Sequence, residues 1–185
     1  MTLRTFIALE LPPSHKSVLQ EHLAQWKRVS QDGINWVHPE NLHLTLLFIG
    51  DTPAGELPVF EQALGEFLLR QRAYELQCLG YELFPATEPR LLWAKLHSAD
   101  KRIFALAKEL AYLAREYDLQ PDEKHLKLHV TIGRIKQQQP TWREAEFLSA
   151  PLPESPDRYD TISLYRSDLH PDGPVYTALQ QYQLR

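Results

Sequence analysis

Residues 41–50, NLHLTLLFIG, and residues 127–134, KLHVTIGR, each place a histidine and a threonine two positions apart in an apolar run. Successive side chains of a β-strand point to opposite faces, so each histidine shares a face with its threonine and the aliphatic residues fill the other. The segments LHLTL (42–46) and LHVTI (128–132) match at the aliphatic positions as well as at the polar ones. The sequence therefore predicts two equivalent strands, each presenting one His-Thr pair to one side.

The apolar periodicity around these motifs alternates between strand and helix. Strands are predicted at residues 3–11, 34–37, 42–50, 74–84, 90–97, 126–135, 159–167 and 174–184. Helices are predicted from Ser14 to Val29, from Leu57 to Leu68, and from Ser98 or Asp100 to Ala114. Residues 137–146 and 149–157 are polar or proline-rich and are predicted as connections. A strand and a helix lead to each motif strand, once before about residue 85 and once after it, which indicates a duplicated unit.

The composition limits the architecture and the partners. The chain has 185 residues, of which 43% are hydrophobic, and this suits one domain or two closely packed lobes. Lys and Arg number 20 against 24 Asp and Glu, a net charge of -4, so no chain-wide basic field exists to hold long nucleic acid. We expect one domain over residues 1–185, a monomer, in which any contact with RNA is local.

The cysteine count and the apolar runs indicate the cellular compartment of the protein. Cys78 is the lone cysteine, which excludes an intrachain disulfide and a cysteine-cluster zinc site. The segment MTLRTFIALELPPS lacks a basic stretch followed by an apolar stretch of signal-peptide length. No apolar run approaches the roughly 20 residues that span a bilayer. The sequence predicts a cytoplasmic protein that does not bind membranes.

The repeated His-Thr pair has two interpretations. A polar residue at alternate positions is usually the solvated face of an antiparallel strand, and this would be the better account of a single copy. A solvated face has no reason to select histidine followed by threonine twice, because Lys, Glu, Ser or Gln would serve as well. Two copies with matching flanks therefore favour a chemical role.

A metal site is the second alternative, because HLKLH places His125 and His129 four positions apart, a spacing that suits shared metal ligation on a helix. The alternating aliphatic residues around His129 argue for a strand instead, and no neighbouring Asp, Glu or Cys cluster completes a ligand set. The sequence favours a site without metal. No role is assigned to the five other histidines, which are His15, His22, His38, His97 and His170.

Two histidines and two hydroxyls suit displacement at phosphorus, in which one imidazole takes a proton from the attacking oxygen and the other gives one to the leaving oxygen. An unperturbed pKa of about 6.5 lets both protonation states exist near neutral pH. In-line displacement places the acid and the base on opposite sides of phosphorus, which a duplicated fold provides. Each threonine hydroxyl can donate to a non-bridging phosphoryl oxygen.

These residues carry a resemblance to a known group, because two H-x-T-x motifs in a chain of this size resemble the 2H phosphoesterase superfamily. The segments RTFIAL, WVHPENLHLTLLFIG, LLWAKL, LHVTIGR and SLYRSDLHPDGPVYTAL are similar in order and spacing to its RNA 2′,3′-cyclic phosphodiesterase branch, also called 2′-5′ RNA ligase. The resemblance implies a bilobal α+β fold, a pseudo-twofold duplication in which two antiparallel sheets line a central cleft and helices pack outside. It implies no metal and no cofactor.

The same resemblance implies a reaction and roles for particular residues. The expected reaction opens an RNA 2′,3′-cyclic phosphate to a 2′-phosphate, with His43 as proton donor and His129 as proton acceptor, and related chemistry joins RNA ends through a 2′-5′ bond. Thr45, Thr131 and Arg134 are the expected substrate-binding residues, and the planar guanidinium of Arg134 can hold two phosphoryl oxygens.

One departure from the family pattern lies next to the second motif. Many relatives carry a proline directly before the second histidine, where this chain has Leu128 preceded by Lys127. Lys127 either adds positive charge near the phosphate or is an exposed strand lysine, and Arg134 either binds the anion or forms a surface ion pair. Further candidates for contacts with ribose or base are Arg4, Phe48 and Tyr176.

Three alternatives to this function stay open at the level of sequence. The site could act on another nucleotide, such as a small cyclic phosphate or a 2′-5′ oligonucleotide, because the motifs determine the chemistry and not the leaving group. The chain could be a nucleotide-binding module without turnover, although both motifs are intact. It could also be a structural protein with two coincidental strand pairs.

Overall fold

The computed structural model describes residues 1–29, 33–122, 124–136, 143–170 and 173–185. Its strands are β1 (Thr2–Glu10), β2 (Ile34–Trp36), β3 (His43–Pro53), β4 (Tyr74–Phe84), β5 (Leu91–His97), β6 (His129–Ile135), β7 (Asp157–Tyr159), β8 (Thr161–His170) and β9 (Gly173–Gln183). Its helices are α1 (Pro13–Val29), α2 (Leu57–Leu68), α3 (Arg102–Glu116), α4 (Glu144–Ser149) and the short 3-10 helix η1 (Pro39–Asn41). The strands and the three long helices that were predicted from the sequence are therefore present.

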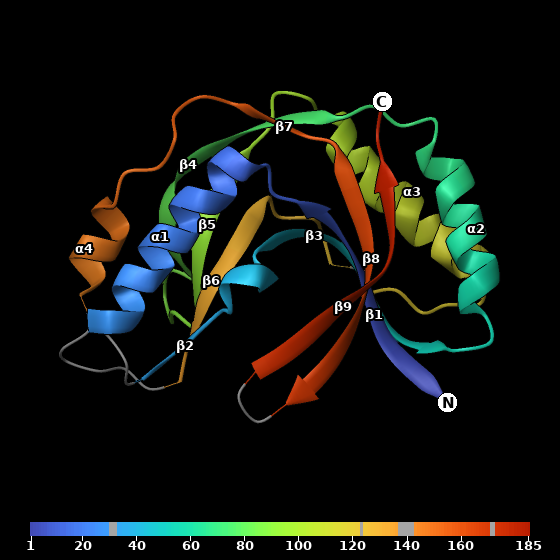
Figure 1. Ribbon diagram of the computed structural model, residues 1–185, viewed down its shortest axis with the longest axis horizontal. Coiled ribbons are helices and arrows are strands. Elements are labelled where there is room, and N and C mark those ends of the chain that lie inside the picture. The colour runs from blue at the N-terminus through green and yellow to red at the C-terminus, as the bar shows by residue number, and fades with distance from the viewer. Residues whose placement is uncertain (30–32, 123, 137–142, 171–172) are drawn as a thin grey trace.

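The strands form two antiparallel sheets, which confirms the predicted α+β fold. Sheet A has the order β3-β1-β8-β9, and sheet B has the order β2-β6-β5-β4-β7. Figure 1 shows sheet B with α1 and α4 on the left, and sheet A with α2 and α3 on the right. The first motif strand, β3, belongs to sheet A and the second, β6, to sheet B, and these two strands contact each other.

The sequence repeat corresponds to a repeated strand-helix-strand unit. The units β1-α1-β3 and β5-α3-β6 correspond, since each pairs its two strands as antiparallel neighbours. The first unit lies before residue 85 and the second after it, where the sequence placed the two copies. β4, which ends at Phe84, nevertheless lies in sheet B, so the two units do not divide the chain into one sheet each.

The helix of each repeated unit packs against the sheet that does not contain the two strands of its own unit. Trp26 of α1 packs against Trp36 of β2, Tyr81 of β4 and Phe147 of α4, so α1 covers sheet B although its flanking strand β1 lies in sheet A. α3 joins the neighbours β5 and β6 of sheet B, yet it contacts β3 of sheet A. The buried apolar residues of both sheets accordingly form one continuous core.

The remaining differences from the predictions are local. The strand predicted at 159–167 is two strands, because β7 pairs with β4 in sheet B and β8 pairs with β1 in sheet A. The connection predicted at 137–146 lies partly outside the described residues, and its last part belongs to α4, a helix of 6 residues that includes the buried Phe147. α1 begins at Pro13, one residue before the predicted start, and the hydroxyl of Ser14 donates to the carboxylate of Asp157.

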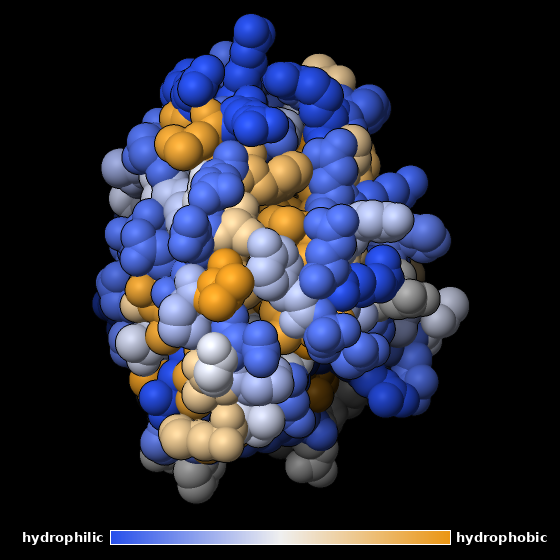
Figure 2. Space-filling model, turned by 90° about the vertical axis from the view of Figure 1, so that its right-hand side faces the viewer, coloured by the Kyte–Doolittle hydropathy of each residue, from blue (hydrophilic) through white to orange (hydrophobic). Residues whose placement is uncertain are grey.

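The outer side of sheet A is a mixed surface. Figure 2 shows this side with hydrophobic side chains scattered among hydrophilic ones. The exposed apolar residues of α2 and α3 include Val59 and Tyr112, which are 55% and 68% exposed. Among the described residues, no helix has the length and hydrophobicity that crossing a membrane requires.

Candidate active site

The two motifs lie on equivalent strands with the same pattern of burial. From His43 to Phe48, and again from His129 to Arg134, the side chains run half-buried, buried, half-buried, buried, buried, exposed. His43 and Thr45 share one face of sheet A, and His129 and Thr131 share one face of sheet B, as alternation predicts. We call these the motif faces of the two sheets.

A β-bulge follows the threonine in both motifs. On β3, Thr45 pairs with Ala8 and Leu47 pairs with Ile7, which leaves Leu46 as an extra residue. On β6, Thr131 pairs with Trp93 and Gly133 pairs with Leu92, which leaves Ile132 as the extra residue. A bulge of one residue reverses the alternation beyond it.

The bulges redirect two further side chains. Strict alternation would place Phe48 and Arg134 opposite their threonines, and the bulge returns both to the motif faces. Phe48 pairs with Phe6 and Arg134 pairs with Leu91 across their sheets. The structure therefore brings Arg134 to the same face as His129 and Thr131, and it places a phenyl ring at the equivalent position beside the first motif.

Both motif histidines are held by the same hydrogen bond. Nδ1 of His43 lies 2.6 Å from the carbonyl oxygen of Asn41, and Nδ1 of His129 lies 2.8 Å from that of Lys127. Each carbonyl belongs to the residue two positions before the histidine. Because a carbonyl can only accept, Nδ1 carries the proton in both rings and Nε2 is the nitrogen free to exchange one.

The Nε2 atoms of the two rings differ in their surroundings. Nε2 of His43 lies 3.0 Å from the hydroxyl oxygen of Thr45. Within the part of the chain that the structure describes, neither Nε2 of His129 nor the hydroxyl of Thr131 has a hydrogen-bond partner. The second motif is thus open to a ligand at both groups, whereas the first pairs them with each other.

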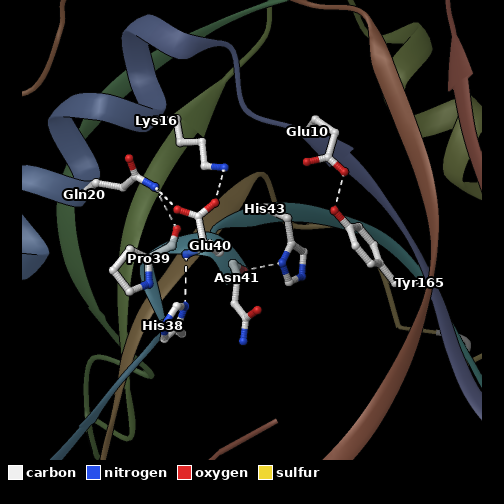
Figure 3. A network of polar contacts seen from close by, with 9 residues as sticks. All are labelled: Glu10, Lys16, Gln20, His38, Pro39, Glu40, Asn41, His43 and Tyr165. Atoms are coloured by element: carbon white, nitrogen blue, oxygen red, sulfur yellow. Dashed lines mark hydrogen bonds and ion pairs between the residues drawn. The ribbon is translucent and has the colours of Figure 1, made fainter. Parts of the chain in front are cut away.

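The short helix η1 fixes the carbonyl that orients His43. Glu40 of η1 bonds to Lys16 at 3.0 Å and to Gln20 at 3.2 Å, which joins η1 to α1 (Figure 3). The side-chain amide of Asn41 donates to the carbonyl of Pro174 on β9 at 2.9 Å. Asn41 is therefore held by α1, through η1, and by β9. Its backbone carbonyl accepts the hydrogen bond from Nδ1 of His43.

Aromatic rings surround His43 on sheet A. The ring centroid of His43 lies 5.0 Å from that of Phe6, 5.3 Å from Tyr176 and 6.2 Å from Tyr165. The phenol of Tyr165 donates a hydrogen bond to the carboxylate of Glu10. Glu10 also pairs with His43 in the register of β1 and β3.

A ring stack supports His129 on sheet B. Trp93 stacks on His129 with centroids 3.8 Å apart, and Phe84 stacks on the other side of Trp93 at 4.0 Å. The ammonium of Lys127 lies 4.0 Å from the centre of the Phe84 ring. Lys127 precedes β6, so it contributes a cation at the edge of this stack and not from within the strand.

Both motif histidines have a lowered pKa. Burial is the main cause in each case, because it disfavours the charged imidazolium. The carbonyl hydrogen bonds and the nearby carboxylates, Glu10 for His43 and Glu82 for His129, act in the opposite direction. His129 also lowers the pKa of His43, so the two rings interact electrostatically although they lie on different sheets.

Two arginines extend the site beyond the histidines. Arg134 of β6 and Arg4 of β1 both stabilise the ionised phenol of Tyr176, although burial raises the pKa of that residue overall. Tyr176 itself packs on Phe6 at 4.9 Å. Within the described ranges, neither guanidinium forms an ion pair with a carboxylate, so Arg134 lacks the surface ion pair that the sequence left open.

The structure does not place His125 and His129 on a helix, which is the arrangement that suggested a metal site. Residues 124–128 form no helix, His125 is exposed, and β6 begins at His129. Among the described residues, no group of three or more His, Cys, Asp or Glu is placed to hold a metal ion.

Sequence reasoning missed three neighbours of the histidines: Glu10, Tyr165 and Trp93. A charged residue interrupts the apolar runs ALEL and WAKL, which belong to the equivalent strands β1 and β5. That interruption was the signal in the sequence for charged residues beside the histidines, since Glu10 pairs with His43 and Lys95 pairs with His129.

Comparison with known proteins agrees with this geometry. A family model described as LigT-like phosphoesterase matches residues 9–93. A curated RNA 2′,3′-cyclic phosphodiesterase from Thermus thermophilus is 35% identical over 192 residues, covering 99% of this chain and 91% of the relative. One from Thermotoga maritima is 28% identical over 182 residues, covering 98% and 95%.

A solved structure shows the same likeness in three dimensions. The crystal structure of a protein from Thermus thermophilus superposes with a TM-score of 0.80 at 31% identity, covering 99% of this chain and 98% of that one. Similarity of this extent includes both sheets and both motif strands. The chain therefore belongs to the family of LigT-like phosphoesterases, within the 2H phosphoesterase superfamily.

Proposed function

We propose that the protein hydrolyses 2′,3′-cyclic phosphates at RNA ends to 2′-phosphates. The observation that carries the proposal is the matched pair of imidazoles, each held at Nδ1 by the carbonyl two residues before it, on two adjoining strands. The curated relatives that cover nearly the whole chain are named RNA 2′,3′-cyclic phosphodiesterases. Both observations favour this reaction over a structural role for the motifs.

The proposed step moves two protons and exchanges one bond at phosphorus. Water attacks phosphorus and gives a proton to Nε2 of His129, while the bond from phosphorus to the 3′-oxygen breaks. The 3′-oxygen takes a proton from Nε2 of His43, which leaves the phosphate on the 2′-oxygen. Acid and base of this kind each contribute roughly 10²–10⁴-fold to such a reaction.

The neighbouring polar groups would stabilise the charge that develops on the phosphoryl oxygens. The hydroxyls of Thr45 and Thr131 share the motif faces with the histidines, and Arg134 reaches the same face through the bulge at Ile132. Hydroxyl and guanidinium donors cover the role that a divalent ion plays in other phosphodiesterases, so the proposed reaction requires no metal.

The first motif offers an apolar surface for the nucleoside. Phe48 is 40% exposed and its ring lies 5.5 Å from Phe6, which in turn contacts Tyr176. Exposed aromatic rings of this kind stack on nucleobases in many RNA-binding proteins. Phe48 and Tyr176 are therefore the proposed contacts for base or ribose, with Arg134 on the phosphate side.

The same site would support formation of a 2′-5′ bond. A 5′-hydroxyl in place of water would lose its proton to His129, and the product would be a 2′-5′ phosphodiester. The proposed substrates are accordingly RNA ends or small nucleotides that carry a 2′,3′-cyclic phosphate.

The test is hydrolysis of a nucleoside 2′,3′-cyclic phosphate and of a short RNA with the same end, each measured with and without EDTA. We expect turnover of both, a 2′-phosphate product and an unchanged rate in EDTA. A 3′-phosphate product, or activity that only zinc or manganese restores, would contradict the proposed mechanism. Turnover of the nucleotide without turnover of the RNA would favour the small-nucleotide alternative.

A further inference from the structure

The two motif histidines face residues of opposite charge across their sheets. His43 of β3 pairs with Glu10 of β1, and His129 of β6 pairs with Lys95 of β5. Directly opposite residues of an antiparallel pair share a face, with Cβ atoms roughly 4.5–5.5 Å apart. β1 and β5 hold equivalent places in the duplicated unit, so charge is a feature in which the two halves of the site differ.

On sheet A, Glu10 is a half-buried carboxylate beside His43. The phenol of Tyr165 donates a hydrogen bond to it, and Figure 3 shows this pair on the side of His43 away from η1. The titratable groups that face His43 are Glu10 from β1, Tyr165 from β8, Tyr176 from β9 and His129 from β6. Burial raises the pKa of both phenols, and Glu10 is the one carboxylate among these four groups.

On sheet B, charges of both signs lie near His129. Lys95 forms an ion pair with Glu82 of β4 at 3.0 Å, and Lys127 caps the ring stack that supports His129. A neighbouring carboxylate favours the imidazolium form of a histidine, and a neighbouring ammonium group favours the neutral form. Glu10 therefore favours the imidazolium form of His43, whereas at His129 the effects of Glu82 and Lys127 oppose each other.

We propose that Glu10 is a positioning residue for His43, favouring against burial the imidazolium form of that ring, which protonates the leaving oxygen. The inference rests on the proposed function for the reaction, but the electrostatic bias belongs to the free protein. It supplies a physical reason for the assignment of acid and base, which two matching motifs cannot supply by themselves.

The first test is a titration of the two histidine rings by NMR in the wild type and in Glu10→Gln. Glutamine keeps the shape of the side chain and can still accept from Tyr165, but it carries no charge. The midpoint of His43 should fall by roughly one pH unit, the low end of the range for a neighbouring opposite charge. The midpoint of His129, which responds to Glu10 only through its coupling to His43, should move by much less.

Tyr165→Phe is the matched control, because it removes the hydrogen bond and leaves the carboxylate. The midpoint of His43 should not fall in this variant. An unchanged midpoint in Glu10→Gln, or an equal fall in both variants, would overturn the inference, since the effect would then not come from the charge of Glu10.

The second test is the dependence of kcat/KM on pH for hydrolysis of a 2′,3′-cyclic phosphate. Loss of the Glu10 charge should move the descending limb, where the acid loses its proton, to lower pH by the amount that NMR measures for His43. The rising limb should stay in place, and a shift of that limb instead would assign Glu10 to the base and contradict the inference. A wild type without turnover would refute the proposed function, while the NMR titration would still decide the role of Glu10.

Discussion

Leu46 of β3 and Ile132 of β6 are equivalent residues, each the unpaired member of a bulge that begins directly after a motif threonine. Both side chains are buried, at 4% and 0% exposure. Their shared position makes Phe48 and Arg134 part of the site, because the reversed alternation carries these residues to the motif faces. The repeated feature is therefore longer than the histidine and threonine, and it includes the break in pairing that follows them.

Gly133, which follows the bulge on β6, lies in close contact with β2, and this gives a prediction. A Cβ atom at Gly133 would lie 3.1 Å from Ile34, 3.2 Å from Trp36 and 3.3 Å from the backbone oxygen of Asn35. The backbone oxygen cannot rotate away, so β2 and β6 must separate. Overpacking of this kind costs roughly 1–3 kcal/mol, and Gly133→Ala should lose about that free energy of unfolding in urea.

Gly55→Ala is the matched control for this prediction, since a Cβ atom there meets nothing within 4 Å. Its stability should stay within experimental error of the wild type. Equal stability of Gly133→Ala and Gly55→Ala would show that β2 adapts to a methyl group and that the bulge does not require glycine.

The sequence predicted the motif strands but not the register in which they pair with the neighbouring strands. LHLTL and LHVTI are local patterns, and alternation within each strand was enough to place the histidine beside its threonine. The bulges leave no local mark, because LLF and IGR fit an unbroken strand equally well and would then direct Phe48 and Arg134 to the core. Which residue faces His43 across the sheet depends on the register of β1, which is a contact distant in sequence.

The sheet against which α1 packs could not be predicted from the sequence for a related reason. The periodicity of Leu19, Leu23 and Trp26 identifies an apolar face of α1 but not the sheet that receives it. That sheet is composed of strands from both halves of the chain, including β4 and β7. A pattern within one segment predicts the element, and only the packing of the whole chain determines its partner.

The two histidines should be individually necessary for turnover. His43→Ala and His129→Ala should each fold and should each lose roughly 10²–10⁴-fold in hydrolysis of a 2′,3′-cyclic phosphate, because each variant lacks one proton transfer. Both side chains are only half-buried, so the core is retained. Circular dichroism is the control for folding, and activity within threefold of wild type in either variant would contradict the paired acid and base.

The pKa values of the histidines predict the pH dependence. Activity of the free enzyme requires one imidazolium and one neutral imidazole, so kcat/KM is highest between the two pKa values. Burial lowers both from the ordinary value of 6.5, and the optimum of kcat/KM should therefore lie below pH 6.5. A bound phosphodiester anion favours the imidazolium, so the optimum of kcat should lie at higher pH than that of kcat/KM.

Initial rates at saturating and at limiting substrate, measured from pH 4.5 to 8.5, check this expectation. Each limb of the pH profile should be lost only in the variant that lacks the corresponding histidine. Buffers of matched ionic strength control for screening of the phosphate charge. An optimum of kcat/KM above pH 7.5 would mean that the carboxylates and carbonyls around the rings outweigh their burial.

The two threonines should contribute unequally, because among the described residues only the hydroxyl of Thr45 has a hydrogen-bond partner. The hydroxyl of Thr45 lies 3.0 Å from Nε2 of His43 and must leave this bond to reach a phosphoryl oxygen. The hydroxyl of Thr131 has no such bond among the described residues. An intramolecular hydrogen bond contributes about 0.5–1.5 kcal/mol, so this difference should make Thr131→Val the more damaging substitution.

Thr131→Val should lose at most about 10²–10³-fold in kcat/KM, the range for one donor to a developing oxyanion, and Thr45→Val should lose several-fold less. Valine keeps the branched shape that strands favour, so both variants should fold. Thr131→Ser and Thr45→Ser restore the hydroxyl and should recover part of the rate. Both limbs of the pH profile should persist in all four variants, since each retains both imidazoles. If Thr45→Val is the more damaging, the hydroxyl of Thr45 acts by orienting Nε2 of His43 and not by contacting the phosphate, and the two motifs would then differ in mechanism as well as in charge.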